Sequence, residues 1–470
     1  MNHITDKRYR IAIPLLGKGA TNHLHRTEVV AAFSSRNVDV SYLVRPDYMP
    51  LLRQMHGCTY HVLEIQTIAG LRARLLCLSR EIRKRFPSTD SGLCKRYEFM
   101  HASASLGGKI ANVFFQLCAR YAWLVKHLVS LEKILCKSVC PQIEPEVRFD
   151  QILLLGLGYK DSEQEGDLTW WSLRNDISVV HIVGNYDNLT ANGYRGVPVS
   201  RLLVWGPNMR KDAISIHGIE SDRVAVIGSI RYNALNEKLR TGYLLPKEEF
   251  LSEIGLDPKK KTLLFAGFFF ESHYFEMLEC LKELNEAGYD FQLILRIYPN
   301  KMFMSSIYLE PLLCFSKSTK NVVVSLADPN YKSGEREKNV LQIEEHELWN
   351  GLNCCDCLIN IYSTIAIEGC MFDKPTIYMG YFPDHPGNFV KRPIYYDYAS
   401  NPHNRRLASY NAIEKASNRV ELKNKIIEAI SNPSRLTAER RHVVEDEIGI
   451  IDGNAHYRLV ENCVEVIGVR

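Results

Sequence analysis

The sequence opens with an alternation of apolar and polar segments that is typical of a layered α/β domain. Residues 10–16 and 38–44 are apolar runs of strand length, and they flank the loop GKGATNHLHR and a helix that we expect to end near residue 36. Further strands are predicted at residues 149–157, 179–183 and 223–229, with a helix at 207–216. A strand–helix–strand beginning of this kind predicts a doubly wound parallel sheet.

A helical and basic segment interrupts this alternation between residues 68 and 140. Residues 71–148 contain 14 Lys and Arg against 6 Asp and Glu, in a chain whose formal net charge is +4. This indicates either a solvated helical face or a basic face for an anionic partner, such as a membrane surface or a phosphorylated acceptor. Residues 109–135 are apolar around much of a helix, which favours a core or interface helix, with membrane apposition as the alternative. The cations expected to meet an anionic surface are Arg80, Arg83, Lys84 and Arg85.

A second α/β pattern follows residues 241–261, which are charged and contain two glycines and two prolines. Strands are predicted at 262–266, 291–297 and 321–325, and a helix at 344–352 precedes a further strand. A terminal helix at 455–467 has its apolar residues on one face. A chain of 470 residues is too long for one ordinary core, so two domains are expected.

The segment DCLINIYSTIAIEGCMFDKP, residues 356–375, is the most informative stretch. Its pattern predicts a buried strand at 357–361 and a helix at 365–372, joined by Tyr362, Ser363 and Thr364. Backbone N–H groups, two hydroxyls and a helix start together form a seat for phosphate, and a plain N-cap at Ser363 is the alternative. A capping box would need Glu or Gln where Ala366 stands, so Glu368 is available to reach a sugar hydroxyl.

Ser363-Thr364, Glu368 and Lys374-Pro375 resemble the donor-binding motif of GT-B glycosyltransferases, in particular bacterial enzymes that build surface polysaccharides and teichoic-acid-like polymers. The order VWG…HGI…RVAVIGS is similar to the end of the first domain in these transferases and in nucleotide-sugar epimerases. The resemblance implies an α/β protein of the GT-B fold, with two Rossmann-like domains and a cleft between them. Ser363 and Thr364 would hold the donor phosphates and Glu368 the ribose.

The resemblance also implies a division of the chain. Residues 1–240 would form the acceptor-side domain, with a helical insert at about 68–145, and residues 241–261 the linker. Residues 262–436 would form the nucleotide-sugar-binding domain, and the C-terminal helices at 437–470 would pack back on the first domain.

Other candidate residues follow predicted strands. Gly267 permits close backbone approach to a phosphate or simply makes a turn, and Arg296 neutralises a diphosphate or forms an ordinary salt bridge. Tyr298 stands where the family usually has a His. For the base that activates the acceptor hydroxyl we expect His25, Asp161 or Asp187, each of which has a purely structural alternative. Asp187 lies in YDNLT, which resembles a WDNLT-like segment of related transferases.

These observations predict a metal-independent glycosyltransferase that moves a sugar from a nucleotide donor to a surface-glycan or lipid-linked acceptor, without a cofactor and without nucleic acid. Three alternatives remain: a nucleotide-sugar 2-epimerase, a CDP-activated polyol-phosphate transferase, and a non-catalytic nucleotide-sugar-binding scaffold. Neither a DxD-like pair nor zinc-site spacing stands out, and GKGATN lacks the third glycine of a nicotinamide-cofactor fingerprint. The 13 scattered cysteines predict reduced thiols in a cytoplasmic protein, peripheral to the membrane at most.

Overall fold

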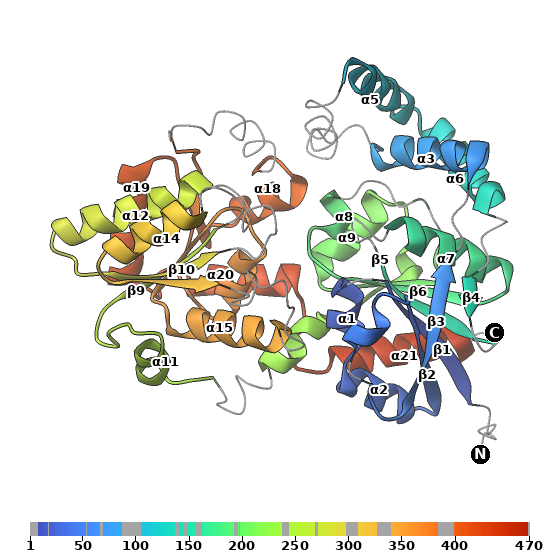
Figure 1. Cartoon of the computed structure of the whole chain (residues 1–470), viewed down its shortest axis with the longest axis horizontal. Helices are drawn as coiled ribbons and strands as arrows, with labels where there is room; N and C mark the ends of the chain where they lie inside the picture. The colour runs from blue at the N-terminus through green and yellow to red at the C-terminus, as the bar shows by residue number, and fades with distance from the viewer. Residues whose placement is uncertain are drawn as a thin grey trace. The chain divides into compact units, whose positions relative to one another are not determined.

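The chain forms two compact α/β units in the computed structural model (Figure 1). The first unit comprises Met1–Asn236 and Glu447–Arg470, and the second comprises Glu237–Asp446. The structure describes residues 8–16, 18–52, 54–65, 69–86, 105–136, 141–143, 148–156, 162–191, 196, 198–236, 244–267, 271–297, 309–326, 340–383 and 399–468.

The first unit is built on an eight-stranded sheet in the order β4-β3-β2-β1-β5-β6-β7-β8. Its pairings are parallel except for that of β3 with the short edge strand β4. The strands are β1 (Tyr9–Leu15), β2 (Val38–Val44), β3 (Cys58–Ile65), β4 (Pro141–Ile143), β5 (Gln151–Gly156), β6 (Ser178–Val183), β7 (Arg201–Val204) and β8 (Val224–Val226).

Helices cover this sheet and extend from it. They are α1 (Lys18–Leu24), α2 (Thr27–Ser34), α3 (Gly70–Lys84), α5 (Leu106–Ala119), α6 (Ala122–Leu135), α7 (Ser162–Arg174), α8 (Asn188–Ala191), α9 (Pro207–Ser215) and α21 (Ala455–Gly468), with 3-10 turns η1 (Met49–Leu51), η3 (Ser221–Arg223) and η4 (Ile230–Tyr232). The predicted loop after β1 was wrong, because it contains helix α1, and the sequence analysis did not predict strand β3 or helix α7.

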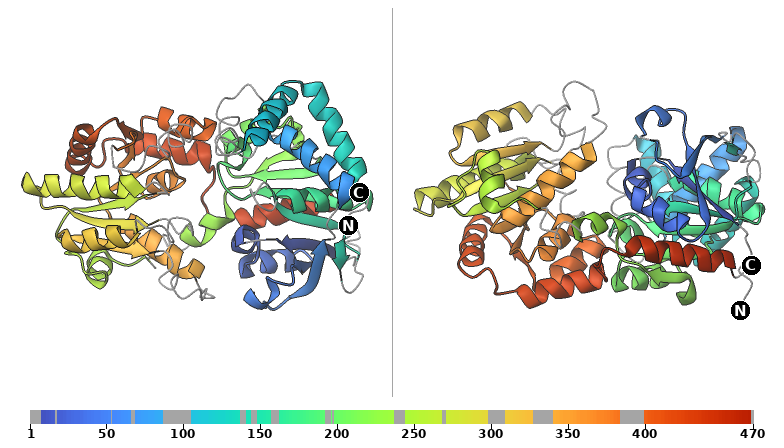
Figure 2. Two further views of the ribbon diagram at one scale, coloured as in Figure 1. Left: turned by 45° about the horizontal axis from the view of Figure 1, so that its top comes forward. Right: turned by 90° about the horizontal axis from the view of Figure 1, so that it is seen from below.

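The C-terminal helix α21 completes the core of the first unit. Its buried residues Leu459, Val460, Cys463 and Ile467 join the cluster that contains β1 and β2 side chains. The helix packs on α2 and against β6 and β7. Both views in Figure 2 show α21, in red, lying along elements that precede it by more than two hundred residues. A segment from the very end of the chain therefore supplies one wall of the first core.

The second unit is a six-stranded parallel sheet in the order β11-β10-β9-β12-β13-β14. Its strands are β9 (Thr262–Ala266), β10 (Gln292–Ile297), β11 (Val322–Leu326), β12 (Cys357–Asn360), β13 (Thr376–Met379) and β14 (Ile413–Ala416). Its helices are α11 (Lys247–Glu253), α12 (Glu271–Glu286), α14 (Leu309–Ser318), α15 (Val340–Cys354), α16 (Ile365–Met371), α18 (Pro402–Ser409), α19 (Arg419–Ser431) and α20 (Thr437–Glu447). Helices α12, α14 and α19 cover one face of the sheet, and α15 with α11 covers the other (Figure 1).

Two helices belong to the second unit, although the predicted division of the chain put one with the first domain and the other in the linker. Helix α20 belongs almost wholly to the second unit, where Arg440 forms an ion pair with Asp373 at 2.7 Å and Thr437 donates a hydrogen bond to the same carboxylate. Helix α11 occupies the stretch predicted as a linker, and Lys247 ties it to Asp356 at 2.9 Å. These ion pairs thus attach α11 and α20, the first and last helices of the second unit in the sequence, to that unit.

Helices α3, α5 and α6 form a module with a charged interior. Arg83 donates to Glu132 at 2.9 Å, and Arg80 donates to Asp167 on α7 at 2.5 Å. Arg85 is fully buried and bonds Glu81 and Asn112. The expectation that Arg80, Arg83 and Arg85 would meet an anionic surface was wrong, because all three are buried and bond Asp167, Glu132 and Glu81.

We predict that Leu459→Ala destabilises the first unit by about 2–5 kcal/mol, since it removes buried methyl groups that the core cannot replace. Urea unfolding followed by tryptophan fluorescence measures the change in midpoint. The matched control is Leu71→Ala, at a largely exposed position on α3, which should shift stability by no more than about 0.5 kcal/mol. Equal effects of the two substitutions would contradict the packing assigned to α21.

Candidate functional site

The strand order of the second unit defines one topological switch point. The chain runs from the central strand β9 outward to β10 and β11, and then returns to the other side of β9 to form β12, β13 and β14. The connections after β9 and after β12 therefore leave the sheet in opposite directions at the same edge. Open α/β sheets bind ligands in the crevice that such a divergence creates.

The register of the strands places the candidate residues at that edge. Ala266 of β9 is paired with Arg296 of β10 on one side and with Asn360 of β12 on the other. Gly267 follows Ala266 directly, and Ser363 follows Asn360 after two residues. The structure thus brings together Gly267, Arg296 and the Ser363-Thr364 pair, which are separated by up to 97 positions along the chain.

The turn between β12 and α16 has an unusual backbone. Tyr362 has a φ of +39°, in the left-handed region that non-glycine residues seldom adopt, and its buried ring lies 4.7 Å from the Tyr378 ring. Thr364 is the N-cap residue of α16, and its side chain makes no capping hydrogen bond. Ser363 is therefore not the N-cap residue of this helix. A strained backbone beside a sheet edge is a feature of ligand-binding turns.

Asn360 is a residue of this turn that the sequence analysis missed. Its side chain is 0% exposed, and its Oδ1 accepts a hydrogen bond from the Ser363 N–H at 3.4 Å. Its Nδ2 has no hydrogen-bond partner within the described part of the chain. A buried donor without a partner is costly, so it marks a place where a ligand or water oxygen belongs. A polar residue ending the apolar run CLIN was the available signal in the sequence.

Close packing of α16 on the sheet places Glu368. A Cβ at Gly369 would come within 2.6 Å of both Leu358 and Thr376, so only glycine allows this approach. Glu368, next to it, is 1% exposed. A carboxylate in such a position is held by its surroundings and does not move freely in solvent.

The other two described candidates in this unit have structural contacts of their own. A Cβ at Gly267 would lie 2.3 Å from the buried ring of Tyr274, which explains the glycine without any ligand. The Arg296 guanidinium is largely buried, lies 3.6 Å from Glu347 and donates to Ser325 at 3.2 Å. Its charge is thus already partly compensated. Tyr298 lies outside the described residues.

The first unit has an equivalent switch point between β1 and β5, since β2 and β3 extend to one side and β6 to β8 to the other. His25 joins α1 to α2, after β1, and Asp187 follows β6. Asp161, which follows β5, lies outside the described residues. The Asp187 carboxylate accepts a hydrogen bond from Asn188 Nδ2 at 3.3 Å. The backbone carbonyl of Asp187 accepts hydrogen bonds from the N–H groups of Thr190 and Ala191 in helix α8.

His25 lies within an aromatic cluster. Its Nε2 is 2.9 Å from the Tyr60 hydroxyl, and its ring meets the Tyr42 ring edge to face at 5.0 Å. Burial lowers the pKa of His25 to about 4, so the imidazole is neutral at pH 7 and a weaker base than a solvated histidine. Burial, with Arg231 and Arg26 nearby, lowers the pKa of neighbouring His23 to about 3.

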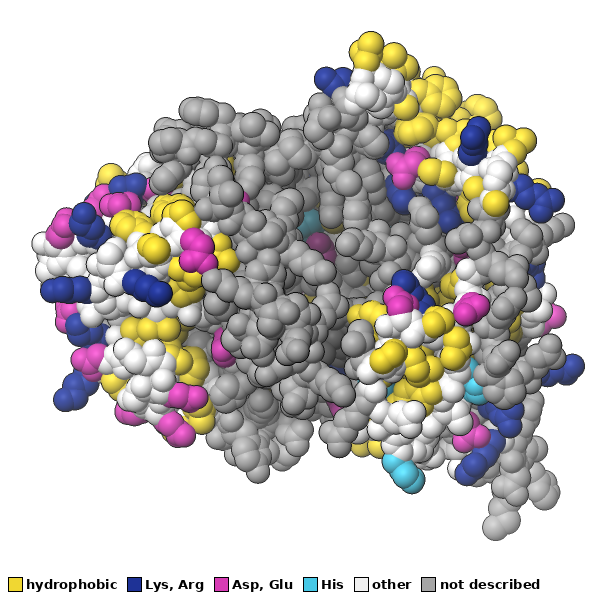
Figure 3. Space-filling view, in the orientation of Figure 1, with side chains coloured by type: hydrophobic (Ala, Val, Ile, Leu, Met, Phe, Trp, Pro, Cys, Tyr) yellow, Lys and Arg dark blue, Asp and Glu magenta, His cyan; other side chains and the backbone are white. Residues whose placement is uncertain are grey.

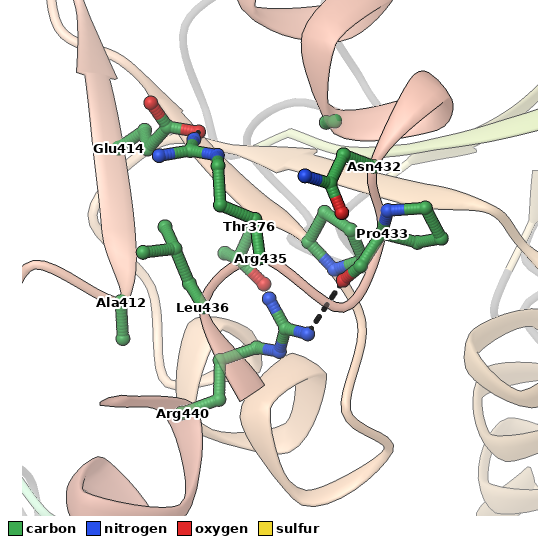
Figure 4. Close-up of a pocket in the computed structure, with 10 residues that line it drawn as sticks. Thr376, Ala412, Glu414, Asn432, Pro433, Arg435, Leu436 and Arg440 are labelled. Carbon is green, nitrogen blue, oxygen red and sulfur yellow. Dashed lines mark hydrogen bonds and ion pairs between the residues drawn. The ribbon is translucent and has the colours of Figure 1, made fainter. Parts of the chain in front are cut away.

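A small pocket at the opposite edge of the second sheet is not a substrate site. It lies near the amino end of β13 and is lined by Glu414, Arg435 and Arg440, among others, with Arg440 donating to the Pro433 carbonyl at 2.7 Å (Figure 4). Its volume of about 10 Å³ is roughly that of a single water site.

The described residues also hold no group of three or more His, Cys, Asp or Glu side chains placed to bind a metal ion. Cys354, Cys355 and Cys357 lie together but are buried, and burial raises the pKa of Cys355 to about 12. A protonated thiol is a poor metal ligand.

Comparison with known proteins supports the fold. No protein-family model matches the sequence. A curated relative, the teichoic acid poly(ribitol-phosphate) polymerase of Bacillus spizizenii, is 25% identical over 206 residues, which are 42% of this chain and 29% of the relative. The chain thus spans less than a third of that relative's length.

Two solved structures align along the whole chain. A putative UDP-N-acetylglucosamine 2-epimerase from Listeria monocytogenes has a TM-score of 0.53 at 10% identity, covering 99% of this chain and 98% of its own. MnaA of S. aureus, in a structure with UDP, has a TM-score of 0.53 at 11% identity, covering 98% of both chains. The predicted fold class, GT-B with two Rossmann-like units, is confirmed by these likenesses.

Proposed function

We propose that this protein is a glycosyltransferase-like enzyme that binds a nucleotide-activated donor at the β9–β12 switch point of its second unit. The observation that carries the proposal is the convergence there of Gly267, Asn360 and Ser363-Thr364. The curated relative, a teichoic acid polymerase, favours a polymer of the teichoic type as the product. The UDP in the S. aureus structure favours a nucleotide as part of the donor.

In this proposal each group at the edge has one task. The Ser363 and Thr364 hydroxyls and nearby backbone N–H groups bind the diphosphate, where negative charge grows as the sugar leaves. The unpartnered Nδ2 of Asn360 donates to an oxygen of the donor, and Glu368 accepts from a ribose hydroxyl. Arg296 attracts the phosphates through its positive charge, although the nearby Glu347 carboxylate weakens that attraction. Gly267 allows the backbone to approach the phosphates.

The base that activates the acceptor hydroxyl is proposed to come from the first unit, with His25, Asp161 and Asp187 as the candidates. A base works best when its pKa lies near the working pH, and His25, with its pKa lowered to about 4, is poorly matched at pH 7. Its contacts with Tyr60 and Tyr42 favour a structural role. Among the two described candidates we therefore rank Asp187 first.

Three other activities fit the same donor seat. A nucleotide-sugar 2-epimerase would release free sugar and nucleotide, a CDP-activated polyol-phosphate transferase would make a new phosphodiester, and a scaffold would bind without turnover. The Listeria monocytogenes structure is described as a putative 2-epimerase, whereas the curated relative is a poly(ribitol-phosphate) polymerase. Analysis of the product bond, glycosidic or phosphodiester, separates these cases.

The remaining parts of the proposal concern partners and location. The acceptor is a glycan or lipid-linked molecule, no nucleic acid takes part, and no cofactor is needed beyond the donor. A cytoplasmic location is supported by the eleven described cysteines, all of which are free thiols. Within the described residues, no helix has the length and apolarity needed to cross a membrane.

We predict that one of UDP, GDP, CDP, CMP, ADP and dTDP raises the melting temperature of the protein, and that Ser363→Ala with Thr364→Ala abolishes the rise. A ligand at a hundredfold excess over its Kd stabilises the folded state by about 2.7 kcal/mol. The matched control is Ser318→Ala with Thr319→Ala, another adjacent pair in the same unit, whose hydroxyls bond the Phe315 carbonyl. Loss of the shift in both double variants, or in neither, would argue against the proposed seat.

We predict that Asp187→Asn reduces turnover by about a hundredfold or more while nucleotide binding stays unchanged, as expected for loss of a general base. His25→Gln should instead lower the melting temperature with a smaller loss of turnover. Initial rates and thermal shifts measured on both variants separate the two roles. Full turnover in Asp187→Asn would move the search to Asp161.

We predict that turnover persists in EDTA, because hydrogen-bond donors rather than a metal ion are proposed to stabilise the leaving diphosphate. The measurement is the initial rate before and after chelation. Loss of most activity in EDTA, followed by recovery on adding Mg²⁺ or Mn²⁺, would refute metal independence.

A further inference from the structure

Helix α5 turns its large apolar side chains outward. Leu106, Ile110, Val113, Phe114 and Leu117 are between 49% and 76% exposed. They recur at the spacing of a single helix face, which in a water-soluble domain is normally the buried one. Figure 3 shows yellow apolar side chains gathered at the upper right, where α5 lies in Figure 1, with dark blue Lys and Arg side chains among them. A continuous exposed apolar stripe of this length marks an interaction surface.

The opposite face of α5 explains this orientation. Asn112 is buried and accepts from both Arg85 Nε and Nη2, at 3.2 and 3.1 Å. The Arg85 guanidinium also lies 5.1 Å from the centre of the Phe115 ring. Turning the apolar stripe inward would break these contacts and leave a buried arginine without them, which is strongly unfavourable. The outward stripe is therefore fixed by the interior and is not an accident of a loosely packed helix.

Within α5 and α6, and at the two residues that join them, the exposed charged side chains are all positive. These side chains are Lys109 on α5, Lys126 and Lys133 on α6, and Arg120 between the two helices. The one acidic residue of the two helices, Glu132, is 1% exposed and bonds Arg83 and Ser79. Tyr121 and Trp123 are also exposed, and such amphipathic aromatic side chains are enriched at membrane interfaces.

We propose that α5, together with α6, docks the protein on the surface of a membrane that contains anionic lipids. The apolar stripe enters the boundary between head groups and acyl chains, and the four cations face lipid phosphates. Helix α5 has 14 residues and is about 21 Å long, shorter than the roughly 30 Å hydrocarbon core, so it lies in the interface plane. The proposal does not depend on which reaction the second unit performs.

Single-sign charge favours lipid over a second copy of this chain. In a symmetric dimer the same patch meets itself, so the four cations of one copy would approach the four of the other. Anionic lipid head groups neutralise them instead. The buried Glu132 leaves no acid on these two helices to compensate a like-charged partner.

We predict that the full chain binds vesicles of phosphatidylcholine with roughly one third phosphatidylglycerol, and binds phosphatidylcholine alone about tenfold more weakly. Flotation of the vesicles measures the bound fraction. Ile110→Ser with Phe114→Ser and Leu117→Ser should weaken binding about tenfold or more, since the apolar contact is lost. Replacing the four cations by Gln should have a similar effect, and so should roughly 1 M salt.

Two matched controls test the face itself. Val420→Ser with Ile450→Ser removes exposed apolar side chains elsewhere, and Gln at Lys259, Lys282, Lys317 and Lys320 removes four exposed cations of the second unit. Neither control should change vesicle binding, and circular dichroism checks that every variant is folded. The proposal is overturned if the α5 variant binds anionic vesicles as the parent does. It is also overturned if sedimentation shows a dimer that the α5 variant disrupts while vesicles capture neither protein.

Discussion

The central constraint on the second unit is the return of the chain to its first strand. After building β10 and β11 to one side of β9, the chain returns to the other edge of β9, where β12 pairs in parallel. Parallel pairing sends the connections after β9 and β12 out at the same end of the sheet. The juxtaposition of Gly267 with Asn360 and Ser363 follows from this topology before any side chain is considered.

Close packing then fixes the positions of the residues that the topology brings together. Glycine at 369 lets α16 lie directly on β12 and β13, and glycine at 267 leaves room for the Tyr274 ring. The same close packing buries Asn360 and Glu368, so their polar groups face a small number of fixed directions. Burial of this kind costs stability wherever a donor has no partner, and among the described residues the Nδ2 of Asn360 has none. This donor lies at the sheet edge where the proposed nucleotide site would be.

Sequence patterns predicted the central strands of each sheet better than the strands near the sheet edges, and they did not predict the ion pairs. Continuous apolar runs such as β12 are unambiguous, because parallel strands buried on both faces contain little else. Strand β3 was missed because its sequence, CTYHVLEI, contains no continuous apolar run like those of the central strands. Helix α7 was not predicted because its acidic first turns show no apolar periodicity. The single predicted helix over residues 109–135 is in fact α5 and α6, which separate at Arg120 and Tyr121.

The basic insert shows why a charge count alone could not identify the binding face. Arg80, Arg83 and Arg85 contribute to the positive charge of the sequence, but their partners Asp167, Glu132 and Asn112 come from 27 to 87 positions away and only the fold brings them inside. With these arginines bonded internally, the exposed cations of the described part of this module are Arg72 and Arg74 on α3, Lys109 on α5, Arg120 between the helices, and Lys126 and Lys133 on α6. By binding Asn112, Arg85 holds that side of α5 inward, where Phe115, Cys118 and Ala119 join an apolar cluster, and the stripe of exposed apolar side chains faces out. The orientation of α5 therefore depends on both the arginine contacts and the apolar contacts inside the module.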